Sequence, residues 1–160
     1  MCTHCRKISQ TWKALWLIIL LVLAFGVLQN SGSAAAAEPV PLPPQSVAPG
    51  EASLTVDLKL PAGHKLNQEA PSTISLQSGD KKILTLDEKY TKNLPVANLP
   101  LCLTVPVKEG QTSLQTTYRL NFCDEKMGIC FFKEGVLTLP VEVSKTAKSK
   151  KLEVSHTVKP

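Results

Sequence analysis

The sequence predicts an all-β protein, an immunoglobulin-like β-sandwich of about seven strands preceded by an N-terminal signal helix. Three observations support this prediction. From Ala52 onward, apolar residues recur at every second position, which is typical of strands with one buried face. Glycine, proline and aspartate residues that favour turns separate these stretches. Over the same part of the chain, no long window has the 3.6-residue period of an amphipathic helix.

The N-terminal segment, residues 1–37, is expected to be an export signal. Basic side chains precede residues 14–28, an apolar run of 15 residues, which is shorter than the roughly 20 residues that a membrane-spanning helix needs. Small residues then offer a cleavage site after Ala37, and an uncleaved membrane anchor is the alternative. Both alternatives place the rest of the chain in the periplasm or outside the cell, with a membrane contact only if the signal is uncleaved.

The composition of residues 38–160 indicates three further segments. Residues 38–50 hold five prolines and are expected to form a stiff, extended linker. The β-sandwich is expected over residues 51–145, followed by a basic C-terminal tail or a last strand at 146–160. Without the signal, 15 basic and 13 acidic residues leave a net charge near +2. Because the chain has no basic patch with interleaved aromatic residues, nucleic acid is not an expected partner.

The first predicted strand covers residues 53–60. Leu54, Val56 and Leu58 recur on one face and alternate with polar residues, the pattern of an antiparallel strand with one solvated face. A turn at Gly63 ends this strand. Shorter alternating stretches predict the next strands at residues 72–77, 82–86 and 101–107.

The longest predicted strand covers residues 112–122, with Leu114 and Phe122 on its buried face. Residues 136–143 repeat the alternation, and a last strand is expected at 151–158. Beyond the signal the chain has no tryptophan, so the buried tryptophan of antibody domains is missing. The prediction therefore concerns the sandwich architecture alone.

Cys123 and Cys130 are the most informative pair of residues. If they lie opposite each other on a hairpin, Phe122 faces Phe131 and residues 125–128 form the turn. Facing cysteines in an oxidising compartment can form a disulfide. The sequence therefore predicts a small disulfide ring at the end of a β-hairpin.

Strand alternation predicts which face carries this disulfide. Phe122 continues the buried face, so Cys123 has the opposite parity and shares the outer face with Arg119 and Asn121. Phe132 is expected beside the disulfide on that face. Nearby basic and acidic side chains would shift a thiol pKa in opposite directions, so the sequence leaves open which cysteine is attacked.

The other cysteines suggest less. Cys102 is expected to be a small, partly buried thiol, and the alternative is a third thiol that exchanges or forms an intermolecular bond. Cys2 and Cys5 form a C-x-x-C motif inside the signal, without the second ligand pair of a zinc site. No cofactor is expected. A copper site is the third function considered, with four soft ligands: Cys102, Cys123, Cys130 and Met127.

Four segments carry a resemblance to a known family: residues 60–71 (LPAGHKLNQEAP), 103–107 (LTVPV), 121–130 (NFCDEKMGIC) and 139–143 (LPVEV). Together they resemble the N-terminal periplasmic domain of the thiol:disulfide interchange protein DsbD and related domains attached to NHL-repeat, thioredoxin-like proteins. The resemblance implies an immunoglobulin-like sandwich. It also implies that Cys123 and Cys130 accept electrons from a thioredoxin-like partner and pass them to exported thiol proteins in their oxidised form, through mixed disulfides.

Two functions therefore stay open at this stage. The first is an exported thiol–disulfide exchange domain with an oxidoreductase-type activity, in which Cys123 and Cys130 are the catalytic residues. The second is a non-catalytic exported binding or assembly module whose disulfide only holds a hairpin, which is the commoner use of exported cysteine pairs. His64 and His156 are isolated in the sequence and are expected at the surface. The chain has no Ser-His-Asp arrangement or glycine-rich phosphate loop that would indicate another enzyme class.

Overall fold

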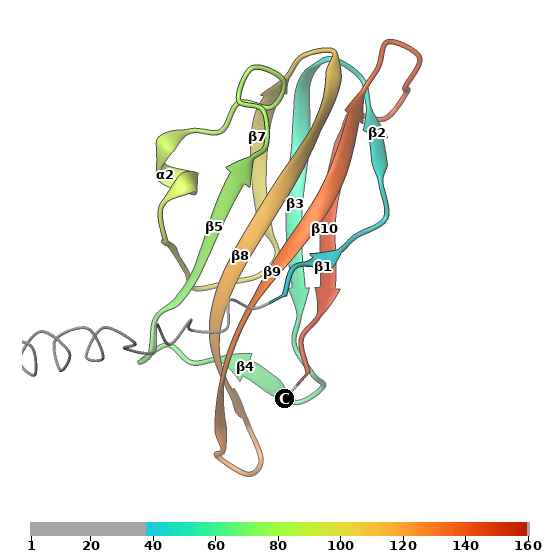
Figure 1. Ribbon diagram of the computed structural model, residues 1–160. Helices are drawn as coiled ribbons and strands as arrows, with labels where there is room; N and C mark the ends of the chain where they lie inside the picture. The colour runs from blue at the N-terminus through green and yellow to red at the C-terminus, as the bar shows by residue number, and fades with distance from the viewer. Residues whose placement is uncertain (1–37, 160) are drawn as a thin grey trace, which may run out of the picture. The chain divides into compact units, whose positions relative to one another are not determined.

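The computed structural model describes residues 38–159, which form two β-sheets and one very short helix (Figure 1). The all-β prediction is confirmed. The expected signal, with Cys2 and Cys5, lies outside the described residues. Within residues 38–159, no helix has the length and hydrophobicity that crossing a bilayer requires.

The larger sheet has seven strands in the order β1-β9-β8-β5-β6, and β2 also pairs with β9 and β4 with β8. Its strands are β1 (Val40–Pro41), β2 (Gln45–Val47), β4 (His64–Leu66), β5 (Ser72–Ser78), β6 (Leu94–Val96), β8 (Gly110–Asp124) and β9 (Cys130–Val143). The two longest strands, β8 and β9, form an antiparallel ladder of 14 residue pairs. Figure 1 shows the turn between them projecting beyond β4.

The smaller sheet has the order β10-β3-β7, with β3 at Gly50–Lys59, β7 at Leu101–Val107 and β10 at Lys151–Thr157. Strand β3 pairs antiparallel with β7 and parallel with β10. Buried side chains of both sheets form one hydrophobic cluster, because the alternation in each strand turns every second residue inward. Among its fully buried members are Leu54, Leu120, Leu139 and Leu152.

The expected linker over residues 38–50 is instead part of the larger sheet. It supplies β1 and β2, which pair in parallel with β9, and its prolines are tolerated because such edge strands can lack a ladder hydrogen bond. The side chain of Gln45 also reaches the smaller sheet. Its Nε2 donates to the Glu153 carbonyl at 2.6 Å, and its Oε1 accepts the Glu153 N–H at 2.9 Å. The segment therefore links the two sheets.

Residues 82–86 do not form the predicted strand. Leu84 alone pairs, in an isolated bridge to Val107. The N–H groups of Ile83 and Leu84 donate to the carbonyl of Asp80 at 3.2 and 3.0 Å. These turn hydrogen bonds take the place of strand pairing, while the Leu84 side chain is fully buried. The apolar alternation in this stretch reflects burial of a turn.

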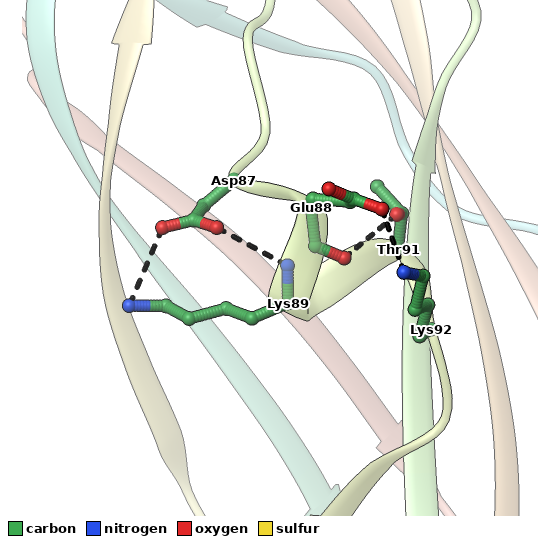
Figure 2. A network of polar contacts seen from close by, with 5 residues as sticks. All are labelled: Asp87, Glu88, Lys89, Thr91 and Lys92. Atoms are coloured by element: carbon green, nitrogen blue, oxygen red, sulfur yellow. Dashed lines mark hydrogen bonds and ion pairs between the residues drawn. The ribbon is translucent and has the colours of Figure 1, made fainter.

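A single helical turn, α2 (Glu88–Thr91), follows and was not predicted. Asp87 caps it, because its Oδ1 accepts the Lys89 N–H at 3.1 Å and its Oδ2 lies 3.5 Å from Lys89 Nζ (Figure 2). Lys92 Nζ donates to Glu88 Oε1 at 2.6 Å, one helical turn away. Four residues are too few to show a helical period in the sequence.

Residues at the C-terminus form the last strand rather than a tail. Strand β10 extends the smaller sheet in parallel with β3, so its apolar residues Leu152 and Val154 are fully buried. The described residues form ten strands where about seven were expected, because β1, β2, β4 and β6 were not predicted and residues 82–86 form no strand. The strand order mixes parallel and antiparallel pairs, and the immunoglobulin-like arrangement stays a prediction.

Candidate functional site

Cys123 and Cys130 form a disulfide at the end of the β8–β9 ladder. The S–S distance is 2.02 Å and the two Cα atoms lie 3.9 Å apart. The next pair inward is Phe122 with Phe131, whose stacked rings have centroids 5.6 Å apart. The predicted register of the hairpin is therefore confirmed.

The turn that joins the two cysteines is held by its own hydrogen bonds. The Asp124 N–H donates to the Ile129 carbonyl at 2.8 Å, and Gly128 has a positive φ of +66°. Asp124 Oδ1 accepts the N–H groups of Lys126 at 2.7 Å and Met127 at 2.9 Å. These two hydrogen bonds hold the pKa of the Asp124 carboxyl below its usual range, and the bond from Met127 has the larger effect. We call residues 124–129 the hairpin tip.

A strand that the sequence did not predict, β4, lies along the other side of β8. It places Lys65 opposite Cys123 and His64 opposite Asp124. Lys65 Nζ also forms an ion pair with Glu125 Oε1 at 2.5 Å. Cys123 consequently lies in the middle of three strands. Three residues are too few for an alternation signal, which explains why Lys65 was missed.

Both histidines pack against aromatic side chains. The ring of His64 lies with its centroid 5.6 Å from that of Phe122 and 5.6 Å from that of Phe131. The ring centroids of His156 and Tyr118 lie 6.2 Å apart. Each is half-buried, and each lies beside an aromatic ring although it is isolated in the sequence. His64 therefore packs against the Phe122–Phe131 pair, next to the disulfide.

The two cysteines differ in exposure. Cys130 is exposed, whereas Cys123 is only partly so. Three exposed apolar side chains lie close to the pair in sequence, Met127 at 65%, Ile129 at 49% and Phe132 at 58% exposure. Phe132 shares the outer face with the disulfide, as its parity predicted. Exposed apolar residues gathered in one place are typical of surfaces that bind a partner.

Charged residues near the disulfide are paired across strands. Arg119 Nε lies 3.2 Å from Glu134 Oε2, opposite it in the ladder. Lys65 is paired with Glu125, as described above. Arg119 and Glu125 are thus engaged in ion pairs, and Lys65 is the basic residue that lies opposite Cys123 in the neighbouring strand.

Cys102 lies in the other sheet. It faces outward from β7, opposite Thr55 on β3, and it is exposed. The expectation of a partly buried thiol was wrong, because β7 is an edge strand and the outer face of its sheet is open. Over residues 38–159, no group of three or more histidine, cysteine or acidic residues is arranged to hold a metal ion. The geometry therefore gives the copper alternative no support.

A pocket of about 430 Å³ lies beside β4. It is lined by the end of β3, by β4 and by residues 97–99. Neither hairpin cysteine lines it. The candidate exchange site is therefore an exposed disulfide and not an enclosed cavity.

Comparison of the sequence with protein-family models and with curated proteins returned no match. The resemblance to the N-terminal domain of DsbD consequently stays a prediction that rests on the four segments named above. Two of these segments are neighbours in the fold, because β4 within residues 60–71 pairs with the end of β8 within residues 121–130.

Proposed function

We propose that this protein is an exported thiol–disulfide exchange domain. It would accept electrons from a thioredoxin-like donor and pass them, through Cys123 and Cys130, to the disulfides of oxidised exported thiol proteins. The observation that carries this proposal is the exposure of Cys130 at the end of the hairpin. Exchange requires a sulfur that an incoming thiolate can reach, and a disulfide buried in a core lacks one.

The difference in exposure between the two cysteines supports one assignment of their roles. The donor thiolate attacks Sγ of Cys130, a mixed disulfide forms, and Cys123 leaves as a thiolate. Lys65, opposite Cys123, favours that leaving thiolate through its positive charge. A second thiol of the donor then attacks the donor sulfur that is bonded to Cys130. The donor's own disulfide forms, and Cys130 is released as a thiolate. The donor ends as a disulfide, and the domain has gained two electrons for transfer to a client.

A purely structural role for the disulfide is the competing function. The hairpin is already held by 14 residue pairs and by the hydrogen bonds of its tip. Closing a ring this small stabilises a fold by about 2 to 3 kcal/mol in the chain-entropy model. The fold is therefore expected to survive without the bond.

The test combines a reduction potential with cysteine variants. We expect the Cys123–Cys130 bond to equilibrate with redox buffers at about −180 to −270 mV, in the range of exchange proteins. The double variant Cys123→Ala/Cys130→Ala should fold, lose about 2 to 3 kcal/mol of unfolding free energy and lose all exchange. A potential below about −300 mV, or a double variant that does not fold, would instead establish a structural staple.

Single variants test the assigned roles. In each single variant the remaining cysteine is first converted to its mixed disulfide with 2-nitro-5-thiobenzoate. In Cys123→Ala, the thiolate of a thioredoxin that lacks its second active-site cysteine should attack Sγ of Cys130, release 2-nitro-5-thiobenzoate and form a stable mixed disulfide, seen by mass spectrometry. Cys130→Ala should trap it much more slowly, because Cys123 is shielded between β4 and β9. Cys102→Ala, in the other sheet, is the matched control and should leave exchange unchanged. Equal trapping by both single variants would contradict the assignment of Cys130.

A further inference from the structure

We propose that the outer edge of β9 beside the disulfide binds an extended segment of the partner polypeptide as an added strand. The bound segment would place its own cysteine opposite Cys130. This inference rests on the proposed exchange function and adds how the partner is recognised. We call residues 130–136 of β9, on the side that faces away from β8, the open edge.

The open edge has no strand partner in the part of the chain that the structure describes. Strand β1 pairs with β9 at residues 137–138, and β2 pairs with it at residues 141–143. Neither reaches the disulfide. The first seven residues of β9 are therefore paired on the β8 side alone.

At every second residue of the open edge, the backbone N–H and C=O groups point away from β8. The Asp124 N–H donates to the Ile129 carbonyl, and hydrogen-bonded pairs alternate with non-bonded pairs in an antiparallel ladder. Cys123 and Cys130 are consequently a non-bonded pair, so the N–H and C=O groups of Cys130 point away from β8. The same holds for every second residue further along, including Phe132 and Glu134.

A hydrogen bond further along β9 supports this parity. Thr138 belongs to the same series as Cys130, and its carbonyl accepts the Leu42 N–H at 2.8 Å next to β1. This side of β9 thus already receives an added segment at its other end. A partner strand at residues 130–136 would continue the sheet in line with β1.

The side chains define what the partner strand should carry. On the outer face the open edge presents Cys130 and then the exposed Phe132, two residues apart. A strand laid beside them pairs residues at the same spacing, which calls for a cysteine with an apolar residue two positions away. On the inner face Lys133 favours an acidic or polar neighbour over a fully apolar strand. The expected partner is an extended, cysteine-bearing segment of a protein.

The reaction at this edge is simple exchange. The cysteine of the bound segment, as a thiolate, attacks Sγ of Cys130, and its proton goes to solvent. One disulfide forms between the segment and Cys130, the Cys123–Cys130 bond breaks, and Cys123 takes the electron pair. No other oxidant or reductant is needed.

A proline substitution separates edge binding from thiol chemistry. Glu134→Pro removes an N–H that points outward and places the proline ring in the path of an added strand, while the ladder to β8 is kept. Pro140 shows that β9 already accepts proline at this parity. Glu134→Gln is the reference variant, because both substitutions remove the ion pair with Arg119. Thr104→Pro makes the same kind of change at the edge of β7 in the other sheet.

The probes are a peptide and a small thiol. The peptide is eight residues long, alternates threonine and valine, and carries a central cysteine with valine two positions away on either side. Oxidised protein is mixed with the peptide or with glutathione, and mixed disulfide is counted by mass spectrometry over time. We expect Glu134→Pro to react with the peptide about tenfold more slowly than Glu134→Gln, the effect of roughly one hydrogen bond. Glutathione should react equally with both, and Thr104→Pro should react with the peptide like wild type.

Equal peptide rates for Glu134→Pro and Glu134→Gln would overturn the open edge as a binding site, even if exchange itself occurs. Absence of exchange with both thiols would overturn the proposed function. In that case, titration with the same peptide carrying serine in place of cysteine tests binding at the open edge without any thiol chemistry. Shifted amide resonances at residues 130–136 on titration would support strand binding, and unshifted resonances there would exclude it.

Discussion

The two ends of the β8–β9 ladder differ in what surrounds them. At the far end, β5 flanks β8 and β2 flanks β9, and the facing pair Leu114 and Leu139 is fully buried. At the disulfide end, β4 covers β8 while β9 has no neighbour among the described residues on its other side. One continuous hairpin therefore combines an end that is flanked by strands on both sides with an end whose β9 edge is unpaired among the described residues.

The largest expected effect tests the flanked end. Leu139→Ala should lower the free energy of unfolding by about 2 to 5 kcal/mol, because it leaves a cavity in a fully buried site. Ile129→Ala, at the half-exposed hairpin tip, should cost less than about 0.5 kcal/mol. Urea denaturation followed by circular dichroism measures both. Similar losses in the two variants would mean that the tip belongs to the cooperative core.

The flanked end was predictable from the sequence because alternation is a local property. Leu114 and Leu139 each lie in a run whose own pattern marks the buried face, so their burial needs no knowledge of neighbours. The edges were not predictable in this way. The prolines of residues 38–50 suggested a linker, yet the segment pairs with β9. Which strand lies beside which depends on contacts distant in sequence.

The same distinction applies to the candidate site. Cys123 and Cys130 are seven positions apart, and hairpin geometry with strand parity was enough to place them opposite each other on the outer face. Lys65 and His64 come from a strand more than 50 positions away. With three residues, that strand is too short to show an alternation of apolar and polar residues. The sequence therefore predicted the disulfide but not the strand that pairs beside Cys123.

A smaller effect separates the two glycines of the hairpin. A Cβ on Gly135, within the ladder, would lie 2.6 Å from the hydroxyl oxygen of the buried Tyr118, so Gly135→Ala should cost about 1 to 3 kcal/mol through overpacking. At Gly128, in the turn, no described atom lies within 4 Å of such a Cβ. There the positive φ alone should make Gly128→Ala cost about 1 kcal/mol. Thermal unfolding monitored by circular dichroism compares them.

Rescue variants identify the two causes. Tyr118→Phe removes the hydroxyl that meets Gly135→Ala, so the double variant should recover part of the loss. Gly128→Asn should be milder than Gly128→Ala, because asparagine tolerates a left-handed backbone. If Tyr118→Phe gives no recovery, the packing explanation for Gly135 is wrong.

The smallest effect concerns Asp124 in the hairpin tip. Backbone N–H groups of Met127 and Lys126 favour its ionised form and lower its pKa in the folded protein. The stabilisation is therefore complete above the unfolded pKa, near 4, and is lost as the pH falls through the folded value. An NMR titration of the Asp124 carboxyl should give a pKa below the ordinary 3.8, and the Met127 amide shift should follow the same curve.

Asp124→Asn is the control for this titration, because it keeps an oxygen acceptor for the Met127 N–H but has no proton to gain. In that variant the Met127 amide should show no step in this pH range. The change should stay confined to residues 124–129, since the core pairs of the ladder lie far from the carboxylate. If resonances of the Leu114–Leu139 pair moved with the same pKa, the two ends of the hairpin would be coupled. The separation between the flanked end and the unpaired end would then be wrong.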